Sequence, residues 1–140
     1  YYCEWQAHSN VTLLMNLGLM MVLSKGDLVL INFNPSKGQE MGKLRPAVVV
    51  SNDQDNEILP TIIVIPLSTV LLDDSEPYRL RIKARDRLEK DSDACVNEVR
   101  ALSKVRVVEL LGSLNVSELK QLVSCLCQVL SVDDTVKLSR

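Results

Sequence analysis

Short apolar runs divide most of the chain into segments that are typical of buried β-strands. Runs of about four to eight apolar residues bounded by polar turns indicate strands. Residues 61–67 are rich in β-branched side chains, which fit a pleated surface, and residues 47–50 are apolar at every position, which indicates burial on both faces. The pattern predicts strands at residues 28–33, 46–51, 61–67, 78–84, 94–101 and 104–110, a turn at 52–56, and a turn or short helix at 88–92.

The last apolar segment has the spacing of a helix, because every third or fourth residue is apolar and these residues share one face. Asn115 and Glu118 have the spacing of a capping box, and Leu114 with Leu119 can form a hydrophobic staple. We expect the apolar face to cover the sheet, and the alternative is that it binds a partner. The residues of this face are Leu119, Leu122, Val123, Leu126, Val129 and Leu130.

The order of these elements predicts the fold class. Many strands followed by one helix indicate a mainly β fold with a C-terminal helix (α+β), in which a barrel-like sheet is covered by the helix. The chain has 140 residues, of which 46% are apolar. This length corresponds to one domain, and this apolar fraction is typical of globular chains.

The first twenty residues differ in composition from the rest of the chain. They hold the only Trp and the only His but no Lys or Arg, so they lack the charged start of a secretory signal. The apolar run at 11–23 is too short to cross a bilayer, and we expect no membrane contact. We expect residues 1–20 to be an extension, residues 21–134 to form the functional domain and residues 135–140 to be a polar tail. The alternative for the extension is a short helix at 12–21 that packs on the domain or on a second subunit.

The four cysteines do not have the spacing of a metal site. Cys125 and Cys127 point to different faces of the predicted helix, Cys3 is near the terminus, and Cys95 lies in a predicted strand. Because no two cysteines are spaced as CxxC and His8 is the only histidine, a zinc site would have too few ligands. We therefore expect no metal, no cofactor, and reduced thiols in a cytoplasmic protein, with Cys95 as a small core residue.

Basic residues occupy every second position between residues 79 and 87. Because alternate side chains of a strand lie on one face, this face would be basic, with Leu80, Ile82 and Ala84 turned inward. It is either a solvated outer face or a surface for phosphates or an acidic peptide. A net charge of −2 and a pI near 5.4 do not by themselves indicate a nucleic-acid-binding protein. The basic residues are Arg79, Arg81, Lys83, Arg85 and Arg87.

A long polar loop joins the first two predicted strands. It contains Gly38 and Gly42, carries Glu40, and ends at Arg45 and Pro46. Most hairpin loops have about 2–5 residues, and longer loops are often functional. A carboxylate and a guanidinium at the edge of a small β-domain indicate a site for an anionic ligand. A solvated loop without a site is the alternative.

Four stretches of the sequence together resemble one known family. The first reads GDLVLINFNPSKGQEMGKLRPAVVVSND and combines GD, NP-x-x-G-x-E and RPAVV; the others read NEILPTIIVIPLST, DSDACVNEVRALSKVRV and LLGSLN. The resemblance is to the MazF/PemK toxins of bacterial toxin–antitoxin systems, which are ribosome-independent mRNA endonucleases. It extends over residues 22–133 without a gap and implies an endoribonuclease with an SH3-like (CcdB/MazF-type) barrel.

The residue types limit how this chain could cut RNA. Attack of a 2′-hydroxyl on the adjacent phosphorus requires groups that stabilise charge on the phosphate and groups that move protons. With one histidine and no acidic cluster that would hold two metal ions, the sequence predicts a metal-independent reaction that uses Arg, Glu and hydroxyl groups. Arg45 is the best candidate, because its guanidinium can bind two phosphate oxygens and Pro46 restricts its backbone.

The resemblance assigns roles to particular residues. The catalytic arginine of the family falls on Arg45, and its active-site hydroxyl, usually Thr, falls on Ser68. The neighbouring Thr69 is an alternative for that hydroxyl. The loop acid of some members falls on Glu40, which would either accept a proton or hold Arg45 in place.

Further residues are expected to contact RNA. Asn97 and Glu98 fall where family members carry an acid and a Gln that bind RNA. Because side chains at such positions read base edges, the recognition sequence of this chain is not predictable. Members with a catalytic Arg and Asp in this region are not matched, since Cys95 and Asn97 stand there. The expected RNA-binding residues are Asn34, Lys37, Lys43, Thr69, Asn97 and Glu98.

The resemblance also implies partners. A toxin of this family cuts single-stranded mRNA as a homodimer and is inhibited by the C-terminal segment of a cognate antitoxin, through which operator DNA is bound. Two alternatives of the same fold are a CcdB-like toxin that binds gyrase and a non-catalytic module that binds nucleic acid or an antitoxin. Glu40, Arg45 and Ser68 together favour the nuclease, because a pure binding protein does not need them.

Overall fold

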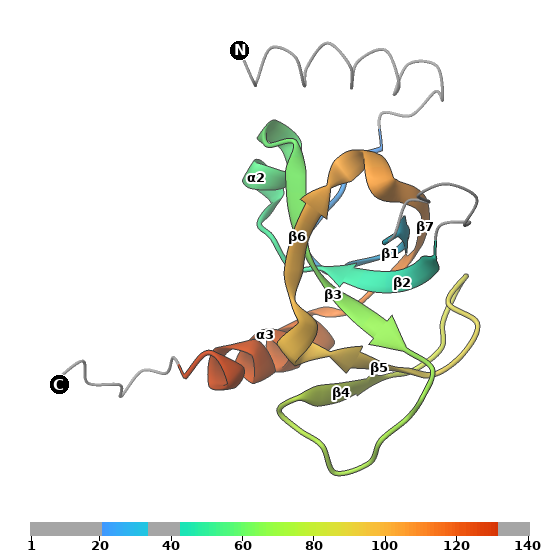
Figure 1. Cartoon of the computed structure of the whole chain (residues 1–140), viewed down its shortest axis with the longest axis vertical. Helices are drawn as coiled ribbons and strands as arrows, with labels where there is room; N and C mark the ends of the chain where they lie inside the picture. Colours follow the sequence, from blue (N-terminus) through green and yellow to red (C-terminus); the bar gives the residue numbers. More distant parts are fainter. Residues whose placement is uncertain (1–20, 34–42, 132–140) are drawn as a thin grey trace, which may run out of the picture.

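The computed structural model describes residues 21–33 and 43–131, which form seven strands and a C-terminal helix. The described elements appear along the chain in Figure 1. They are β1 (Asp27–Asn32), β2 (Leu44–Val49), α2 (Asp53–Ile58), β3 (Thr61–Ser68), β4 (Arg79–Ile82), β5 (Ser92–Cys95), β6 (Arg100–Ser103), β7 (Val107–Ser113) and α3 (Val116–Val129), with 3₁₀ turns at Val96–Glu98 and Lys104–Arg106.

The strands form one antiparallel sheet in the order β4-β5-β3-β2-β1-β7, and β6 pairs with β3. β6 and β7 belong to one continuous segment that leaves β3 and reaches β1 through the turn Lys104–Arg106. Figure 1 shows how this segment curls the sheet into a ring. No ladder joins β6 to β7 within these fully described strands, so the barrel is not closed by hydrogen bonds. The predicted mainly β, barrel-like fold with a C-terminal helix is confirmed.

Alternate residues of β1 and β2 enter two different hydrophobic clusters. Leu28 and Val48 belong to the cluster that lies against α3, whereas Val29 and Val49 belong to a second cluster on the other side of these strands. Successive side chains of a strand point to opposite faces, so an apolar residue at every position buries both faces. The expected burial of residues 47–50 on both faces is confirmed for the three residues from 47 to 49, and Val50 is half-buried.

The helix α3 covers one cluster and begins where the sequence predicts. Its Leu122 and Cys125 are buried in the cluster, and Leu126 packs against it. Asn115 Oδ1 accepts from the Glu118 amide at 2.8 Å, and Glu118 Oε1 accepts from the Asn115 amide at 2.9 Å. Both hydrogen bonds of the capping box are therefore present. The packing role of the helix is confirmed for Leu119, Leu122, Leu126 and Val129, whereas Leu130, expected on the same face, is exposed.

The predicted turn at residues 52–56 is wrong, because α2 begins there. Asn52 Oδ1 accepts from the Asp55 amide at 2.8 Å, which satisfies a free donor at the helix start, and Asp53 and Asp55 place negative charge in the first turn. Asn56 is buried, and its Nδ2 donates to the Ser51 carbonyl at 3.0 Å. A strong cap followed by acidic residues therefore produces a short helix where composition alone indicates a turn.

Three other predicted elements are corrected. The predicted strand 94–101 is broken by the 3₁₀ turn Val96–Glu98, so that β5 and β6 pair with different parts of β3. The predicted strand 104–110 starts as a 3₁₀ turn and becomes β7 only at Val107. The turn or short helix predicted at 88–92 is a turn that lies earlier: the chain turns at residues 86–87, closed by a β-bridge between Arg85 and Leu88, and Ser92 already belongs to β5.

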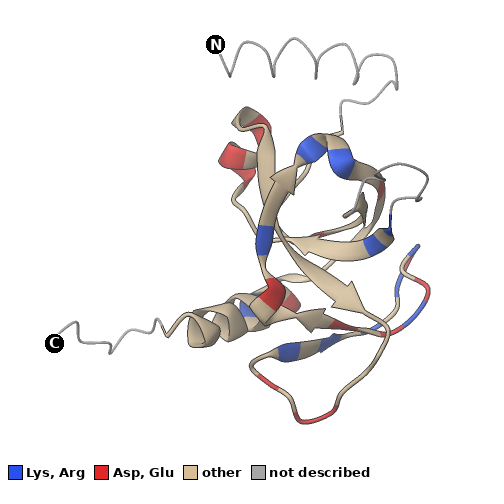
Figure 2. Ribbon diagram, viewed as in Figure 1, with Lys and Arg blue, Asp and Glu red and all other residues tan. Residues whose placement is uncertain are grey.

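The predicted basic strand face is confirmed only for Arg79 and Arg81, because β4 ends at Ile82, and the arginines pair within the molecule. Arg79 and Arg81 both contact Asp93, Arg85 binds Glu118, and Arg87 lies 3.2 Å from Glu109. The side chains of Leu80 and Ile82 are buried as expected, whereas Ala84 is exposed. Figure 2 shows acidic positions on the neighbouring strand and loops close to the basic positions of β4 and of the segment that follows it.

The remaining expectations concern the thiols and the chain ends. Among the described cysteines, Cys95 and Cys125 are buried free thiols and Cys127 is a half-buried one. Cys95 is thus a core residue, as predicted. No helix in the described part of the chain is long and apolar enough to span a membrane. The expected extension at 1–20, with its alternative helix, and the tail at 135–140 lie outside the described residues.

Candidate active site

Arg45 and Ser68 lie side by side on neighbouring strands. Ala47 of β2 is paired with Pro66 of β3, and continuing this antiparallel register by two residues places Arg45 opposite Ser68. Arg45 Nη2 donates to the Leu67 carbonyl at 3.1 Å, so the guanidinium lies against the end of β3. The fold thus places the guanidinium predicted from the sequence at the end of β3, the strand whose last residue carries the predicted hydroxyl 23 positions further along the chain.

Two further arginines gather around Phe33, the residue that follows β1. The Arg45 guanidinium carbon lies 5.7 Å from the Phe33 ring centroid, and that of Arg100 lies 5.4 Å from it. Arg106 Nη1 donates to the Phe33 carbonyl at 3.0 Å. The negative face of an aromatic ring attracts cations, which favours holding two guanidinium groups close together. The result is a concentration of positive charge at the end of β1, around Phe33.

This arginine cluster draws on three separate parts of the chain. Arg45 comes from β2, Arg100 from β6 and Arg106 from the 3₁₀ turn between β6 and β7. Figure 2 shows the basic positions of these elements around the ring that β1, β2, β6 and β7 form. Planar guanidinium groups that converge on one point can bind several oxygens of a phosphate or of a nucleic-acid backbone.

The hydroxyl of Ser68 has a defined partner. The Val70 amide donates to Ser68 Oγ at 3.1 Å, so the hydroxyl proton can be donated elsewhere, for example to a phosphate oxygen. Ser68 is partly exposed, and Thr69, the alternative hydroxyl, is exposed at the start of the loop after β3.

The structure describes some of the other predicted site residues. Lys43 is exposed just before β2, and its carbonyl accepts from the Phe33 amide at 3.0 Å. Asn97 and Glu98 are exposed in the turn that leads to β6, three and two residues before Arg100. The remaining predicted residues, Asn34, Lys37 and Glu40, lie outside the described residues.

The sequence analysis missed Phe33, Arg100 and Arg106 as parts of this site. Phe33 has the pattern of an ordinary strand residue, and only 8% of its surface is exposed. Arg100 and Arg106 lie within the DSDACVNEVRALSKVRV run that carries the family resemblance, but only the folded chain brings them to Phe33.

Two other kinds of group bear on the chemistry near the site: the Cys95 thiol and the possible metal ligands among the described residues. Burial raises the pKa of the Cys95 thiol, so this side chain is neutral and unreactive at physiological pH. In the described part of the chain, no three His, Cys, Asp or Glu side chains lie close enough together to hold a metal ion.

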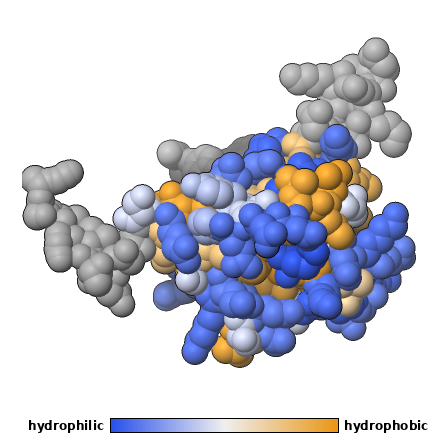
Figure 3. Space-filling view, turned by 90° about the horizontal axis from the view of Figure 1, so that it is seen from below, coloured by the Kyte–Doolittle hydropathy of each residue, from blue (hydrophilic) through white to orange (hydrophobic). Residues whose placement is uncertain are grey.

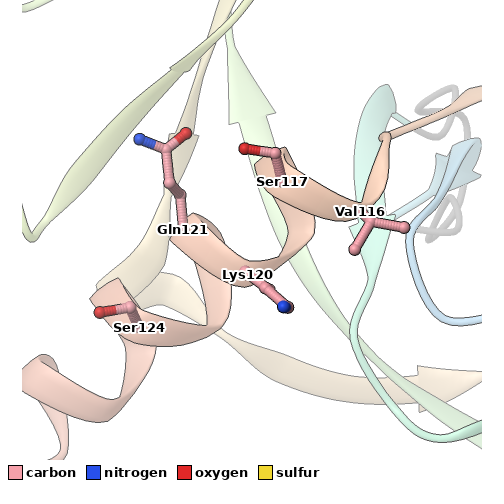
Figure 4. A pocket seen from close by; sticks show the side chains of 5 residues that line it. All are labelled: Val116, Ser117, Lys120, Gln121 and Ser124. Carbon is pink, nitrogen blue, oxygen red and sulfur yellow. The ribbon is translucent and has the colours of Figure 1, made fainter.

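A shallow hollow on α3 is separate from these residues. It is lined by Val116, Ser117, Lys120, Gln121 and Ser124, all from the first turns of the helix. Figure 4 shows that these side chains point in different directions and do not converge on a common point. The hollow contains no predicted site residue, and the cluster around Phe33 therefore remains the candidate site.

Comparison with known proteins identifies the family. The family model described as PemK-like, MazF-like toxin of type II toxin–antitoxin systems matches residues 24–130. This chain belongs to the MazF/PemK toxin family. It is 32% identical over 101 residues to the endoribonuclease MazF of Staphylococcus saprophyticus, a match that covers 71% of this chain and 84% of that protein.

Solved structures of MazF proteins have the same fold. A chain of the MazE–MazF crystal structure from Deinococcus radiodurans aligns with a TM-score of 0.67 at 23% identity, over 81% of this chain and all (100%) of that chain. A mycobacterial endoribonuclease in complex with its cognate antitoxin aligns with a TM-score of 0.60 at 16% identity, over 82% and 99% of the two chains. The resemblance to the MazF/PemK family and the predicted fold are both confirmed.

Proposed function

We propose that this chain is a metal-independent endoribonuclease toxin that cuts single-stranded mRNA at a short specific sequence and so inhibits translation and growth in the cytoplasm. The observation that carries the proposal is the adjacency of Arg45 and Ser68 within a cluster of arginines. Membership of the family and the 32% identity to an endoribonuclease MazF support it.

In the proposed reaction, the 2′-hydroxyl oxygen attacks the adjacent phosphorus and loses its proton to a base. The bond from phosphorus to the 5′-oxygen breaks, and that oxygen takes up a proton. The products are a 2′,3′-cyclic phosphate and a 5′-hydroxyl. Arg45 stabilises the charge that develops on the non-bridging oxygens, and Ser68 donates a hydrogen bond to one of them. Glu40 either accepts the proton or holds Arg45, and we favour the second role.

We also propose that the phosphate backbone of RNA is bound by Arg45 and Arg100 together. The two guanidinium groups face one aromatic ring within 6 Å, so a phosphate near the ring can reach both. Base selection would then fall to the RNA-binding residues predicted from the sequence, which flank this cluster or belong to the loop before β2. These are Asn34, Lys37, Lys43, Thr69, Asn97 and Glu98.

We propose that the toxin is a homodimer that a cognate antitoxin inhibits through an acidic C-terminal segment, with operator DNA bound through the antitoxin. The Deinococcus MazE–MazF structure and the mycobacterial endoribonuclease–antitoxin complex support an antitoxin partner. Because Arg79, Arg81 and Arg85 are already paired with Asp93 and Glu118, the acidic segment should bind the arginines around Phe33 instead of the β4 strand. RNA and antitoxin should then compete.

The test is to incubate the purified protein with a long single-stranded RNA in EDTA. We expect discrete cuts in the RNA and none in DNA of the same sequence, which lacks the 2′-hydroxyl. RNA that stays intact with EDTA and with added Mg²⁺ would contradict the proposal and favour a gyrase-binding or non-catalytic protein of the same fold. Cleavage only with the metal would contradict the metal-independent mechanism.

A further inference from the structure

The loop that follows β3 starts at Ser68 and therefore determines where the candidate hydroxyl lies. Its apolar residues Val70, Leu71 and Leu72 are 64%, 42% and 47% exposed. The loop lies at the lower edge of the molecule in Figure 1, and the view from below in Figure 3 shows a mostly hydrophilic surface with a few hydrophobic patches. Apolar burial therefore contributes little to the position of the loop, and polar contacts must hold it.

A buried carboxylate makes the central polar contact. Asp93 of β5 is 1% exposed, and its Oδ2 accepts from the Leu72 amide of the loop at 2.8 Å. Its Oδ1 accepts from Arg81 Nε at 2.6 Å, and its Oδ2 lies 3.7 Å from Arg79 Nη1. One carboxylate thus joins the loop backbone to two arginines of β4.

The two arginines each hold a second point of the loop. Arg79 Nη1 donates to the Val70 carbonyl at 3.0 Å, and Arg81 Nη2 donates to Asp73 Oδ1 at 2.9 Å. The Leu72 amide is bound to Asp93, so Val70, Leu72 and Asp73 of the loop are all bound to one charged cluster. This cluster of Asp93, Arg79 and Arg81 is called the loop clamp below.

The loop clamp is continuous with the candidate site. Asp93 is the ladder partner of Ser68, and the Val70 amide, next to the carbonyl that Arg79 binds, donates to Ser68 Oγ. The contacts therefore lead from the buried carboxylate through Val70 to the hydroxyl that is expected to contact RNA.

We propose that Asp93 is a positioning residue whose carboxylate, through Arg79 and Arg81, fixes the loop after β3 and with it the hydroxyl of Ser68. The claim that Asp93 places Ser68 for catalysis rests on the proposed function, whereas the claim that Asp93 holds the loop does not. Asp93 itself need not touch RNA, because it is buried beneath the loop.

The electrostatics of the clamp agree with this role. Burial alone would raise the pKa of Asp93, but the hydrogen bonds from Arg81 and the Leu72 amide and the charges of Arg81 and Arg79 outweigh it and lower the pKa below its usual range. Asp93 is therefore ionised at neutral pH. An Asn at this position has nearly the same shape, but its NH₂ group would face either Arg81 or the Leu72 amide, both of which are hydrogen-bond donors. One of the two hydrogen bonds is then lost, so the clamp cannot stay intact.

The first test measures hydrogen exchange of the Val70 and Leu72 amides in the wild type and in Asp93→Asn. We expect both amides to exchange at least about tenfold faster in the variant, while the amides in the middle of β3 keep their relative protection. The matched control is Glu118→Gln, which removes the carboxylate of the Arg85 pair at α3 and leaves the loop clamp intact. Arg79→Met removes the contacts to the Val70 carbonyl and to Asp93 but leaves Asp93 bound to Arg81 and to the Leu72 amide. It should have a smaller effect at the same amides and serves if Asp93→Asn does not fold.

The second test measures RNA cleavage by the same variants. Misplacing a group by about 1 Å can cost on the order of 10²-fold in rate, so we expect kcat to fall about 10- to 100-fold in Asp93→Asn. KM should change little because Arg45 and Arg100 are intact, and Glu118→Gln should keep normal kcat.

The outcomes separate the two parts of the inference. Unchanged exchange at Val70 and Leu72 would overturn the clamp. Faster exchange with unchanged kcat would overturn the positioning of Ser68 for catalysis. If the wild type cuts no RNA, the proposed function fails, and the exchange rates alone still decide whether Asp93 holds the loop.

Discussion

Two arginine clusters in this protein have opposite surroundings. In the loop clamp, Arg79 and Arg81 surround the buried carboxylate of Asp93, so their charge is used within the molecule. At Phe33, Arg45 and Arg100 face an aromatic ring, which attracts cations without neutralising them. The comparison teaches that arginines of one small domain can be fixed as structural contacts by a buried acid, as in the loop clamp, or be held at an aromatic ring, where we propose that they bind an anion.

The comparison also separates phosphate binding from loop geometry. If the cluster at Phe33 binds phosphate, its loss should affect the reaction far more than the fold. Loss of an arginine of the loop clamp should affect the stability of the fold more than the reaction, because removing one partner of a buried ion pair lowers stability. The following predictions test this division.

Replacing Arg45 should have the largest effect. We expect Arg45→Ala to lower the cleavage rate on the order of 10²–10³-fold, the loss typical of one charge-stabilising donor. Arg45→Lys should also be slow, because a point charge does not replace a planar pair of donors. The melting temperature should stay close to that of the wild type. The matched control is Arg87→Ala, which removes an exposed arginine paired with Glu109 and should cleave normally. Normal cleavage by Arg45→Ala would remove this residue from the site.

Replacing Arg100 should have a smaller effect that appears mainly in binding. A hydrogen bond to a charged group contributes about 1.5–3 kcal/mol, so Arg100→Gln should weaken RNA binding about 10- to 100-fold. It should also lower the slope of log affinity against log salt by about 0.7, the value for one phosphate contact on a single strand. Filter binding of an uncleavable RNA at several salt concentrations measures both. An unchanged salt slope would show that Arg100 does not contact phosphate.

Replacing Ser68 should be milder than replacing Arg45. A neutral donor contributes about 0.5–1.5 kcal/mol, so Ser68→Ala should slow cleavage by roughly 2- to 10-fold. If Thr69 takes over the role, the double variant Ser68→Ala/Thr69→Val should be slower than the product of the two single effects. Additive single effects would show that the two hydroxyl groups act independently.

Acid should weaken the two structural ion pairs first. The hydrogen bonds from Arg85 lower the pKa of Glu118, and those from Arg81 and the Leu72 amide keep the pKa of Asp93 low despite its burial. Because both folded-state pKa values lie below the unfolded values of about 4, their stabilisation is complete above that pH and is lost as the pH falls below it. The charged groups that act on the Asp93 carboxylate are Arg81 and Arg79, and both lower its pKa.

Urea unfolding between pH 7 and pH 2.5 measures this loss. We expect the free energy of unfolding to be nearly flat down to pH 5 and to fall steeply below about pH 4. Glu118→Gln should show a shallower fall than the wild type. An equally steep fall in the variant would show that Glu118 is not one of the groups responsible.

Local patterns predicted the regular parts of the fold but not its interruptions. The helix cap at Asn115 and Glu118 and the two-sided burial of β2 depend on residues close in sequence, and both were predictable. The break at Val96–Glu98 was not, because it arises where the chain passes from pairing with one end of β3 to pairing with the other. The same residues would form a plain strand in a flat sheet.

The candidate site was predictable only in part: the long loop and the family resemblance both indicated Arg45, and the resemblance alone indicated Ser68. Arg45 and Ser68 were selected from the sequence, and the register of β2 and β3 brings them together. The contacts of Arg100 and Arg106 with Phe33 join residues 67 and 73 positions apart, and no local pattern encodes them. The pairing of Arg81 with Asp93 was missed for a related reason, because alternating basic residues resemble a solvated strand face until the acid on the neighbouring strand is known.

The most direct test of the central claim is the chemistry of the RNA ends that cleavage leaves. A single-stranded RNA cut in EDTA should give downstream fragments that polynucleotide kinase labels without phosphatase treatment, which identifies a 5′-hydroxyl. The upstream fragments should end in a 2′,3′-cyclic phosphate, and a single 2′-deoxy substitution at the cleaved position should abolish the cut. Fragments with 5′-phosphate ends, or a cut that survives the 2′-deoxy substitution, would contradict attack by the 2′-hydroxyl at the Arg45 site.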